Sequence, residues 1–382
     1  MAPRSDDAQG TTTSPRDVVA LAGANLISAV GSLPLHLLPV VTATLMAGGR
    51  ASAVQAGGVA SSLLLGQLAS SLALPAVGIG TISRSAVVAL GCALAAGLFV
   101  SGLSGVGALY AGWCVVGLCC GVLQYLGVVT AAAYRDPRLA FVLRLGIVLT
   151  LAGAVVGALR LAGTLVSYHG LMVLLCTVFG LLLAIGAALF RPEYMVPADG
   201  WGSSLRPRDA PGLAAVFVLF VGQTGFLVHV VQRAIDRGML SGEVIWAFSA
   251  IKVAAGLALL ALLLRHRGDQ EPRFLILGLV LAACIAVVSA TTDVVVFFVG
   301  LLAFEIGFNT LSARLQARVV MVSRVGRWLT GAILLGAALG PPLHGWALGV
   351  GSGSDFIAFA VASALVPWAW EFFFNRRRGH GA

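Results

Sequence analysis

Residues 191–211, RPEYMVPADGWGSSLRPRDAP, form the long polar connector of this 382-residue chain. On either side of it, the sequence consists of apolar stretches separated by short gaps. A helix needs about 20 apolar residues to cross the hydrocarbon of a bilayer, and these stretches have about that length. We therefore expect six membrane spans before the connector and six after it, at 18–44, 53–78, 86–104, 106–133, 140–166, 170–190, 212–233, 243–264, 274–291, 293–313, 328–350 and 354–374.

The composition excludes several classes of protein. Only 10% of the residues are charged, whereas a soluble domain carries about 25%. The net charge of +9 lies at the ends of the spans and not on one basic face, so we expect no nucleic-acid partner. We find no nucleotide-binding GxxxxGK, no HExxH and no paired carboxylates, and therefore predict no enzyme, no ATP-driven pump and no cofactor. The six cysteines lie in apolar stretches without a CxxC pair, which favours packing over disulfide or metal roles.

The arginines predict the orientation. Eighteen of them lie in the two tails, in the central connector and in the gaps after spans two, four, eight and ten, whereas only Arg50, Arg233 and Arg237 lie in the other gaps. Cytoplasmic loops are the ones enriched in Arg and Lys. We therefore predict a cytoplasmic tail (1–17), a six-helix bundle (18–190), a cytoplasmic loop (191–211), a second bundle (212–374) and a basic cytoplasmic tail (375–382). The expected location is a bacterial cytoplasmic membrane, with lipids as neighbours.

Three motifs carry a resemblance to a known family. Ala76-Val-Gly78-Ile-Gly80-Thr-Ile-Ser-Arg84, between spans two and three, keeps the glycines and one Arg of the signature G-x-L-a-D-r-x-G-r-r but lacks its Asp. Gly117 and Gly121 keep the glycines of a span-four pattern, and Gly336-Ala-Ala-Leu-Gly340-Pro341 carries a G-x-x-x-G-P element in span eleven. With its six plus six spans, the whole chain resembles the major facilitator superfamily of secondary transporters. The resemblance implies an all-α membrane fold of two six-helix bundles, a central site, alternating access and a monomer.

Ionisable groups inside spans are costly and are therefore candidates for function. Glu305 and Lys252 lie at similar depth in spans ten and eight, which face the central cavity in that superfamily. We expect them to form an ion pair, with Glu305 as the proton-coupling carboxylate; a permanent structural pair is the alternative. Arg160, in span five, is a second candidate cation for an anionic substrate, or it extends to the membrane surface. Arg144, at the inner end of the same span, is interpreted as an interfacial anchor.

Polar residues at helical spacing predict a lined cavity, with hydrogen bonding between helices as the alternative. Asn25, Ser28, Ser32 and His36 share one face of span one, and Glu305, Asn309, Ser312 and Gln316 share one face of span ten. The candidate substrate-binding residues are Lys252, Arg160, Gln223, Gln67, Gln124, Asn309, Asn25 and Ser32.

Two further groups complete the candidate site. His36 and His229 occupy corresponding positions in the two halves and are candidate proton relays; a copper site formed across helices is a weaker alternative. Arg84, Gly340 and Pro341 are candidate gating residues, because prolines are expected to kink or break spans one and eleven.

The sequence thus predicts a secondary transporter that moves a small organic solute, preferably an anion or zwitterion, with a coupling proton. An exporter of lipophilic drugs or metabolites is the alternative within transport, since apolar walls with one buried Glu suit cations. A non-transporting assembly factor or sensor is the alternative from another class, and the missing signature Asp favours it.

Overall fold

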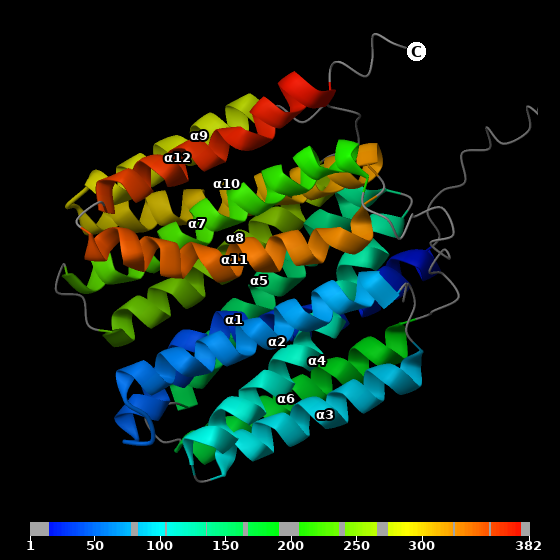
Figure 1. Ribbon diagram of the computed structural model, residues 1–382, viewed down its shortest axis with the longest axis vertical. Coiled ribbons are helices and arrows are strands. Elements are labelled where there is room, and N and C mark those ends of the chain that lie inside the picture. The colour runs from blue at the N-terminus through cyan, green and yellow to red at the C-terminus, as the bar shows by residue number, and fades with distance from the viewer. Residues whose placement is uncertain are drawn as a thin grey trace, which may run out of the picture.

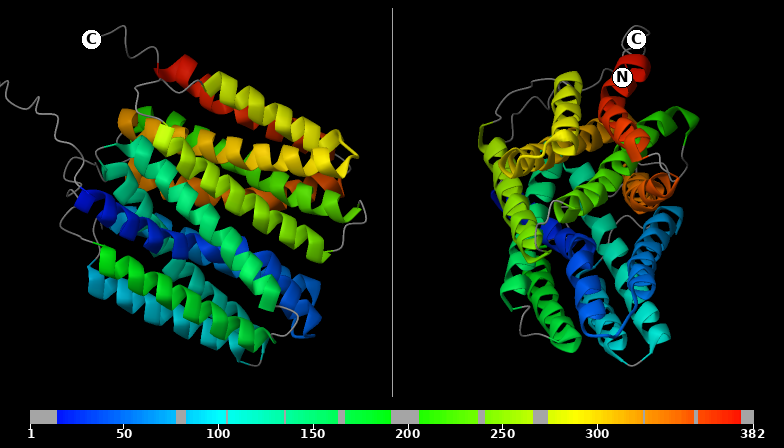
Figure 2. Two further views of the ribbon diagram at one scale, coloured as in Figure 1. Left: turned by 180° about the vertical axis from the view of Figure 1, so that it is seen from behind. Right: turned by 90° about the vertical axis from the view of Figure 1, so that its left-hand side faces the viewer.

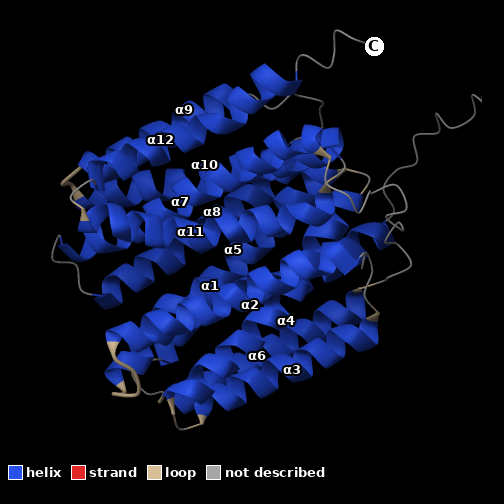
Figure 3. Ribbon diagram, in the orientation of Figure 1, coloured by secondary structure: helices blue, strands red, loops and turns tan. Residues whose placement is uncertain are grey.

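A computed structural model describes residues 15–77, 83–103, 105–134, 136–162, 167–190, 206–236, 241–265, 274–323, 325–350 and 353–375. Within these ranges the chain forms helices and no strand (Figure 3). The α-helices are α1 (Pro15–Ala47), α2 (Ala53–Val77), α3 (Arg84–Gly102), α4 (Val106–Ala133), α5 (Pro137–Ala162), α6 (Tyr168–Leu189), α7 (Ala210–Asp236), α8 (Ser241–Arg265), α9 (Phe274–Ala290), α10 (Val294–Ser323), α11 (Gly326–Gly349) and α12 (Gly353–Trp370), followed by the π-helical turn η3 (Glu371–Asn375). The predicted all-α architecture of twelve helices is confirmed.

The helices run side by side along a common direction (Figures 1 and 2). Helices α1, α2, α3, α4 and α6 pack mainly against one another, as do α7, α9, α10, α11 and α12. Helix α5 packs extensively on α8, and α2 packs on α11, so these pairs join the first half of the chain to the second. Among the described residues, nine helices are long and apolar enough to span a membrane, and α8 and α9 hold shorter apolar segments.

One predicted helix end is wrong. Helix α10 continues to Ser323, well beyond the expected end at residue 313, so Arg314 and Arg318 lie in the helix and not in a loop. The segment after residue 313 contains no Gly or Pro to end the helix. The extension brings Arg318 to Glu371 of η3, with 2.8 Å between Nη2 and Oε1.

Small residues allow α5 and α8 to touch backbone to backbone. A Cβ atom at Gly153 would lie 2.6 Å from the carbonyl oxygen of Ser249, and one at Gly256 would lie 2.8 Å from the carbonyl oxygen of Gly146. The Ser249 hydroxyl also donates to the Gly153 carbonyl at 2.7 Å. In lipid, where apolar burial does not drive helices together, such close packing and interhelical hydrogen bonds hold them.

A methyl group added at this contact tests its importance. In Gly256→Ala the new Cβ meets the Thr150 side chain and the Gly146 carbonyl, so α5 and α8 must separate. We expect a loss of about 1–3 kcal/mol, typical of overpacking, seen as a lower melting temperature in detergent. Gly180→Ala on α6 is the control, because nothing lies within 4 Å of that Cβ position. Equal melting temperatures of the two variants would refute the contact.

Candidate substrate and coupling site

The predicted ion pair joins α8 to α10. Lys252 Nζ lies 3.3 Å from Glu305 Oε1, and the Lys252 and Glu305 side chains are 13% and 2% exposed. Asn309, one turn further along α10, donates from Nδ2 to Glu305 Oε2 at 3.1 Å and to the Glu305 carbonyl at 2.8 Å. Both carboxylate oxygens of Glu305 therefore accept a hydrogen bond.

The ion pair lowers the free-energy cost of burying both charges, but it does not use all the hydrogen-bond donors of Lys252. An ammonium group has three N–H donors, and among the described residues only Glu305 accepts one from Lys252. His36 of α1 is half-buried, and its role as a proton relay stays a prediction. The cluster of Lys252, Glu305 and Asn309 can thus offer a cationic donor and a proton-binding carboxylate.

Two of the three glutamines of the candidate site donate hydrogen bonds to a neighbouring helix. Gln67 donates to the Gly31 carbonyl at 3.1 Å, and Gln223 donates to the Ala360 carbonyl at 3.1 Å and to Ser363 Oγ at 2.8 Å. These bonds join α2 to α1 and α7 to α12, as the interhelical alternative expects. The buried Oε1 atoms of all three glutamines, Gln67, Gln124 and Gln223, have no hydrogen-bond partner among the described residues.

The polar face of α1 is buried as well. Asn25 is fully buried, and neither of its side-chain amide atoms has a hydrogen-bond partner. Ser32, two turns along, donates its hydroxyl to the Ser28 carbonyl at 3.2 Å. Among the predicted binding residues of the first half, Asn25, Gln67 and Gln124 therefore keep buried polar atoms without a partner in the described part of the chain.

The candidate gating residues contact their own half of the chain. Arg84 donates to the Phe190 carbonyl at 2.9 and 2.7 Å, which ties the start of α3 to the end of α6. Gly340 packs closely on α7. The helices are not broken at the prolines, since α11 continues through Pro341 and Pro342, and α1 continues past Pro34. Their gating role stays a prediction, as do the roles of Arg160 and His229, whose side chains lie outside the described part of the structure.

Arg144 is the residue that the sequence interpretation misjudged. It is no interfacial anchor, because its side chain is only 2% exposed within α5. Its Nε donates to Ser28 Oγ of α1 at 2.9 Å. The signal that could have found it is Ser28, which lies on the polar face of span one and needs a partner once that face is buried.

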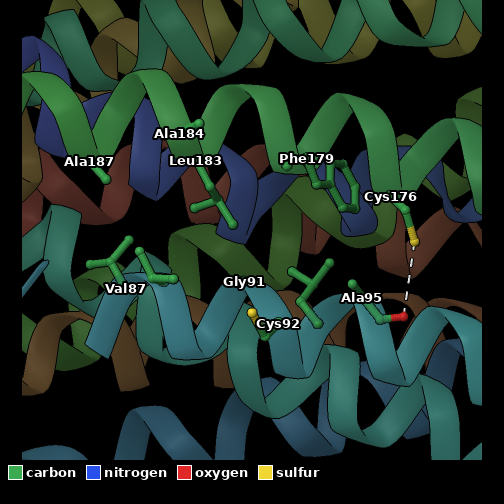
Figure 4. Close-up of a pocket in the computed structure, with 12 residues that line it drawn as sticks. Val87, Gly91, Cys92, Ala95, Cys176, Phe179, Leu183, Ala184 and Ala187 are labelled. Carbon is green, nitrogen blue, oxygen red and sulfur yellow. Dashed lines mark hydrogen bonds between the residues drawn. The ribbon is translucent and has the colours of Figure 1, made fainter. Parts of the chain in front are cut away.

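An apolar groove lies elsewhere, between α3 and α6 (Figure 4). Its volume is about 300 Å³, and its lining includes Val87, Gly91, Cys92, Phe179 and Leu183. None of the candidate substrate or coupling residues lines this groove, so it is separate from the polar site.

The structure resembles known transporters across nearly its whole length. The human organic anion transporter MFSD10 (TETRAN) matches with a TM-score of 0.68 at 14% identity, covering 95% of this chain and 100% of its own. The proton:xylose symporter XylE matches with a TM-score of 0.66 at 11% identity, covering 93% and 94%. FucP in the outward conformation matches with a TM-score of 0.64 at 14% identity, covering 94% and 98%. The chain therefore has the major facilitator fold.

No family profile matches the sequence, and no curated protein matches it either. The major facilitator fold thus rests on the structure, and with the long apolar helices it makes the chain a multi-pass membrane protein. At 11–14% identity the structural similarity establishes the fold of this chain but does not identify its substrate.

A double-mutant cycle measures the central pair. Lys252→Met should destabilise the protein, because the nearly fully buried Glu305 then loses its cation. Adding Glu305→Gln to it should recover much of the loss, giving a coupling free energy of about 1–3 kcal/mol. The measurement is thermal or denaturant unfolding in detergent. Strictly additive effects of the two changes would mean that the residues do not interact.

Proposed function

We propose that this protein is a secondary active transporter that carries a small organic anion or zwitterion across a bacterial cytoplasmic membrane by alternating access, coupled to protons. The observation that carries the proposal is the buried cluster of Lys252, Glu305 and Asn309. A charge at this depth in a bilayer costs several kcal/mol. A stable helix bundle has no need of such a cluster, since an apolar pair would fill the same space.

The coupling follows from the chemistry of the pair. While Glu305 is ionised it holds Lys252, and its own charge opposes the entry of an anion. Protonation of Glu305 removes that negative charge and leaves Lys252 as a cation that favours the entry of an anionic cargo. The cargo and the proton then bind together. Loss of the proton from Glu305 restores the ion pair and favours release of the cargo.

The two halves of the chain are the moving parts of this proposal. We assign residues 18–190 and 212–374 to bundles that rock about the contact between α5 and α8, with both chain termini in the cytoplasm. The major facilitator fold supports alternating access, and the names of two similar proteins, an organic anion transporter and a proton:xylose symporter, fit an anionic cargo and a coupling proton.

A ligand panel tests the class of cargo. The purified protein is melted with organic anions, amino acids, sugars, lipophilic cations or Cu(I), each at two pH values, since a ligand that binds the native state raises the melting temperature. Any stabilising compound is then offered to proteoliposomes for uptake. Stabilisation by lipophilic cations alone, lost in Glu305→Gln, would replace this proposal with the exporter of drugs or metabolites. An absence of both stabilisation and flux would favour a non-transporting assembly factor or sensor.

Proton coupling has its own prediction. Glu305→Gln keeps the shape and hydrogen-bonding oxygen of the side chain but cannot take up a proton. We expect uptake driven by an imposed pH gradient to fall at least about tenfold, in line with the loss of a proton-transfer group, while exchange of labelled for unlabelled cargo without a gradient continues. Asp293→Asn, an exposed carboxylate at the start of α10, is the control and should leave both rates unchanged. Retained gradient-driven uptake in Glu305→Gln would rule out Glu305 as the coupling group.

A further inference from the structure

Arg144 is a buried cation whose counter-charge is not provided by the described residues. It lies inside the candidate span Pro137–Leu159 with 2% of its side chain exposed. Its hydrogen bond is to the neutral hydroxyl of Ser28. The ion pairs found in the described part of the chain join other residues, Lys252 with Glu305 and Arg318 with Glu371.

The side chain of Arg144 is positively charged although it is buried. The guanidinium stays protonated in proteins and carries five N–H donors, of which the described residues accept one. An uncompensated charge away from water is strongly unfavourable, whereas a bound carboxylate can accept two parallel N–H bonds from a guanidinium. The Arg144 guanidinium therefore has N–H donors from which an anion can accept hydrogen bonds.

Other polar atoms at the same helix junction also lack partners. Asn25 lies one turn before Ser28 on α1, is fully buried and has neither side-chain atom hydrogen-bonded. Helix α4 meets this face of α1 closely, because Gly127 abuts Ser28 and a Cβ at Gly31 would lie 2.7 Å from the backbone nitrogen of Gln124. The unpartnered Oε1 of Gln124 thus belongs to the same junction of α1, α4 and α5.

We propose that Arg144 binds the carboxylate of the cargo, that Ser28 positions its guanidinium, and that the Asn25 amide donates a further hydrogen bond. The acceptor oxygen of Gln124 then suits a hydroxyl or ammonium group elsewhere on the same molecule. This inference rests on the proposed transport of an anion or zwitterion and names the residue that recognises its charge. Lys252 is already held by Glu305 in this structure, whereas Arg144 has no carboxylate.

The test is ligand-induced stabilisation of the full-length protein in detergent. The probes are acetate, lactate, succinate, citrate and benzoate, each compared with sodium chloride at equal ionic strength and, for benzoate, with neutral benzamide. At least one carboxylate should raise the melting temperature of the wild type above its chloride control. In Arg144→Gln the affinity for that carboxylate should fall at least about tenfold, the loss of a charge-assisted hydrogen-bond pair, and Arg144→Lys should retain part of it. Arg138→Gln, on the same helix, is the matched control and should keep the full effect.

Stability without ligand separates binding from a structural role. If Arg144 is retained for binding, Arg144→Gln should melt at or above the wild-type temperature in chloride, because an isolated buried charge is removed. A lower melting temperature in chloride, together with an undiminished carboxylate shift, would overturn the proposal. So would a wild type that none of the carboxylates stabilises.

The outcomes also distinguish this inference from the proposed function. A carboxylate shift that survives Arg144→Gln but disappears in Lys252→Met would overturn the role of Arg144 and leave anion transport standing. Proton-coupled uptake of a cation or a sugar, without a carboxylate shift, would overturn both the role of Arg144 and the anionic cargo.

Discussion

The contact between α5 and α8 joins the two halves of the chain, and the polar site depends on it. Gly153 allows the backbone of one half to reach Ser249 of the other. Lys252 lies one turn further along α8, beside Val253, which also packs on Gly153. Arg144 lies two turns before Gly153 on α5. Arg144 bonds to Ser28 of α1 and Lys252 bonds to Glu305 of α10. The α5–α8 contact therefore joins the two helices that carry these cations, and a change in the angle between the halves moves both helices.

The two cations are compensated in different ways, although both lie in a medium that penalises charge. Lys252 has a carboxylate from its own half of the chain, and that carboxylate is also held by Asn309. Arg144 has a hydroxyl. The second half is thus closer to electrostatic balance by itself, while the first half gains more from an incoming anion. This asymmetry gives a physical reason for cargo to bind at the first half and for a proton to act at the second.

The sequence predicted features that the bilayer imposes, and missed features that depend on contacts between distant helices. Membrane thickness sets the length of each apolar stretch, so the helices could be located, and the cost of an intramembrane charge made a pair of Lys252 and Glu305 the expected arrangement. No periodicity states which helix lies opposite Arg144, so its burial against Ser28 was missed. The positive-inside pattern places Arg314 and Arg318 at the end of a span but does not show whether the helix stops there. Arginine is a good helix former, so α10 continues to Ser323.

The signature motif between α2 and α3 lacks its Asp, and the Arg84 side chain binds a backbone carbonyl. Arg84 donates to the carbonyl of Phe190, an acceptor that cannot gain or lose a proton in the physiological range. The contact between the start of α3 and the end of α6 is therefore a bond between a permanent cation and a neutral dipole, and its strength does not change with pH. A carboxylate in its place would have offered a titratable group at the start of α3. The proposed proton coupling therefore rests on Glu305, whose carboxylate binds Lys252 of α8 and Asn309 of α10.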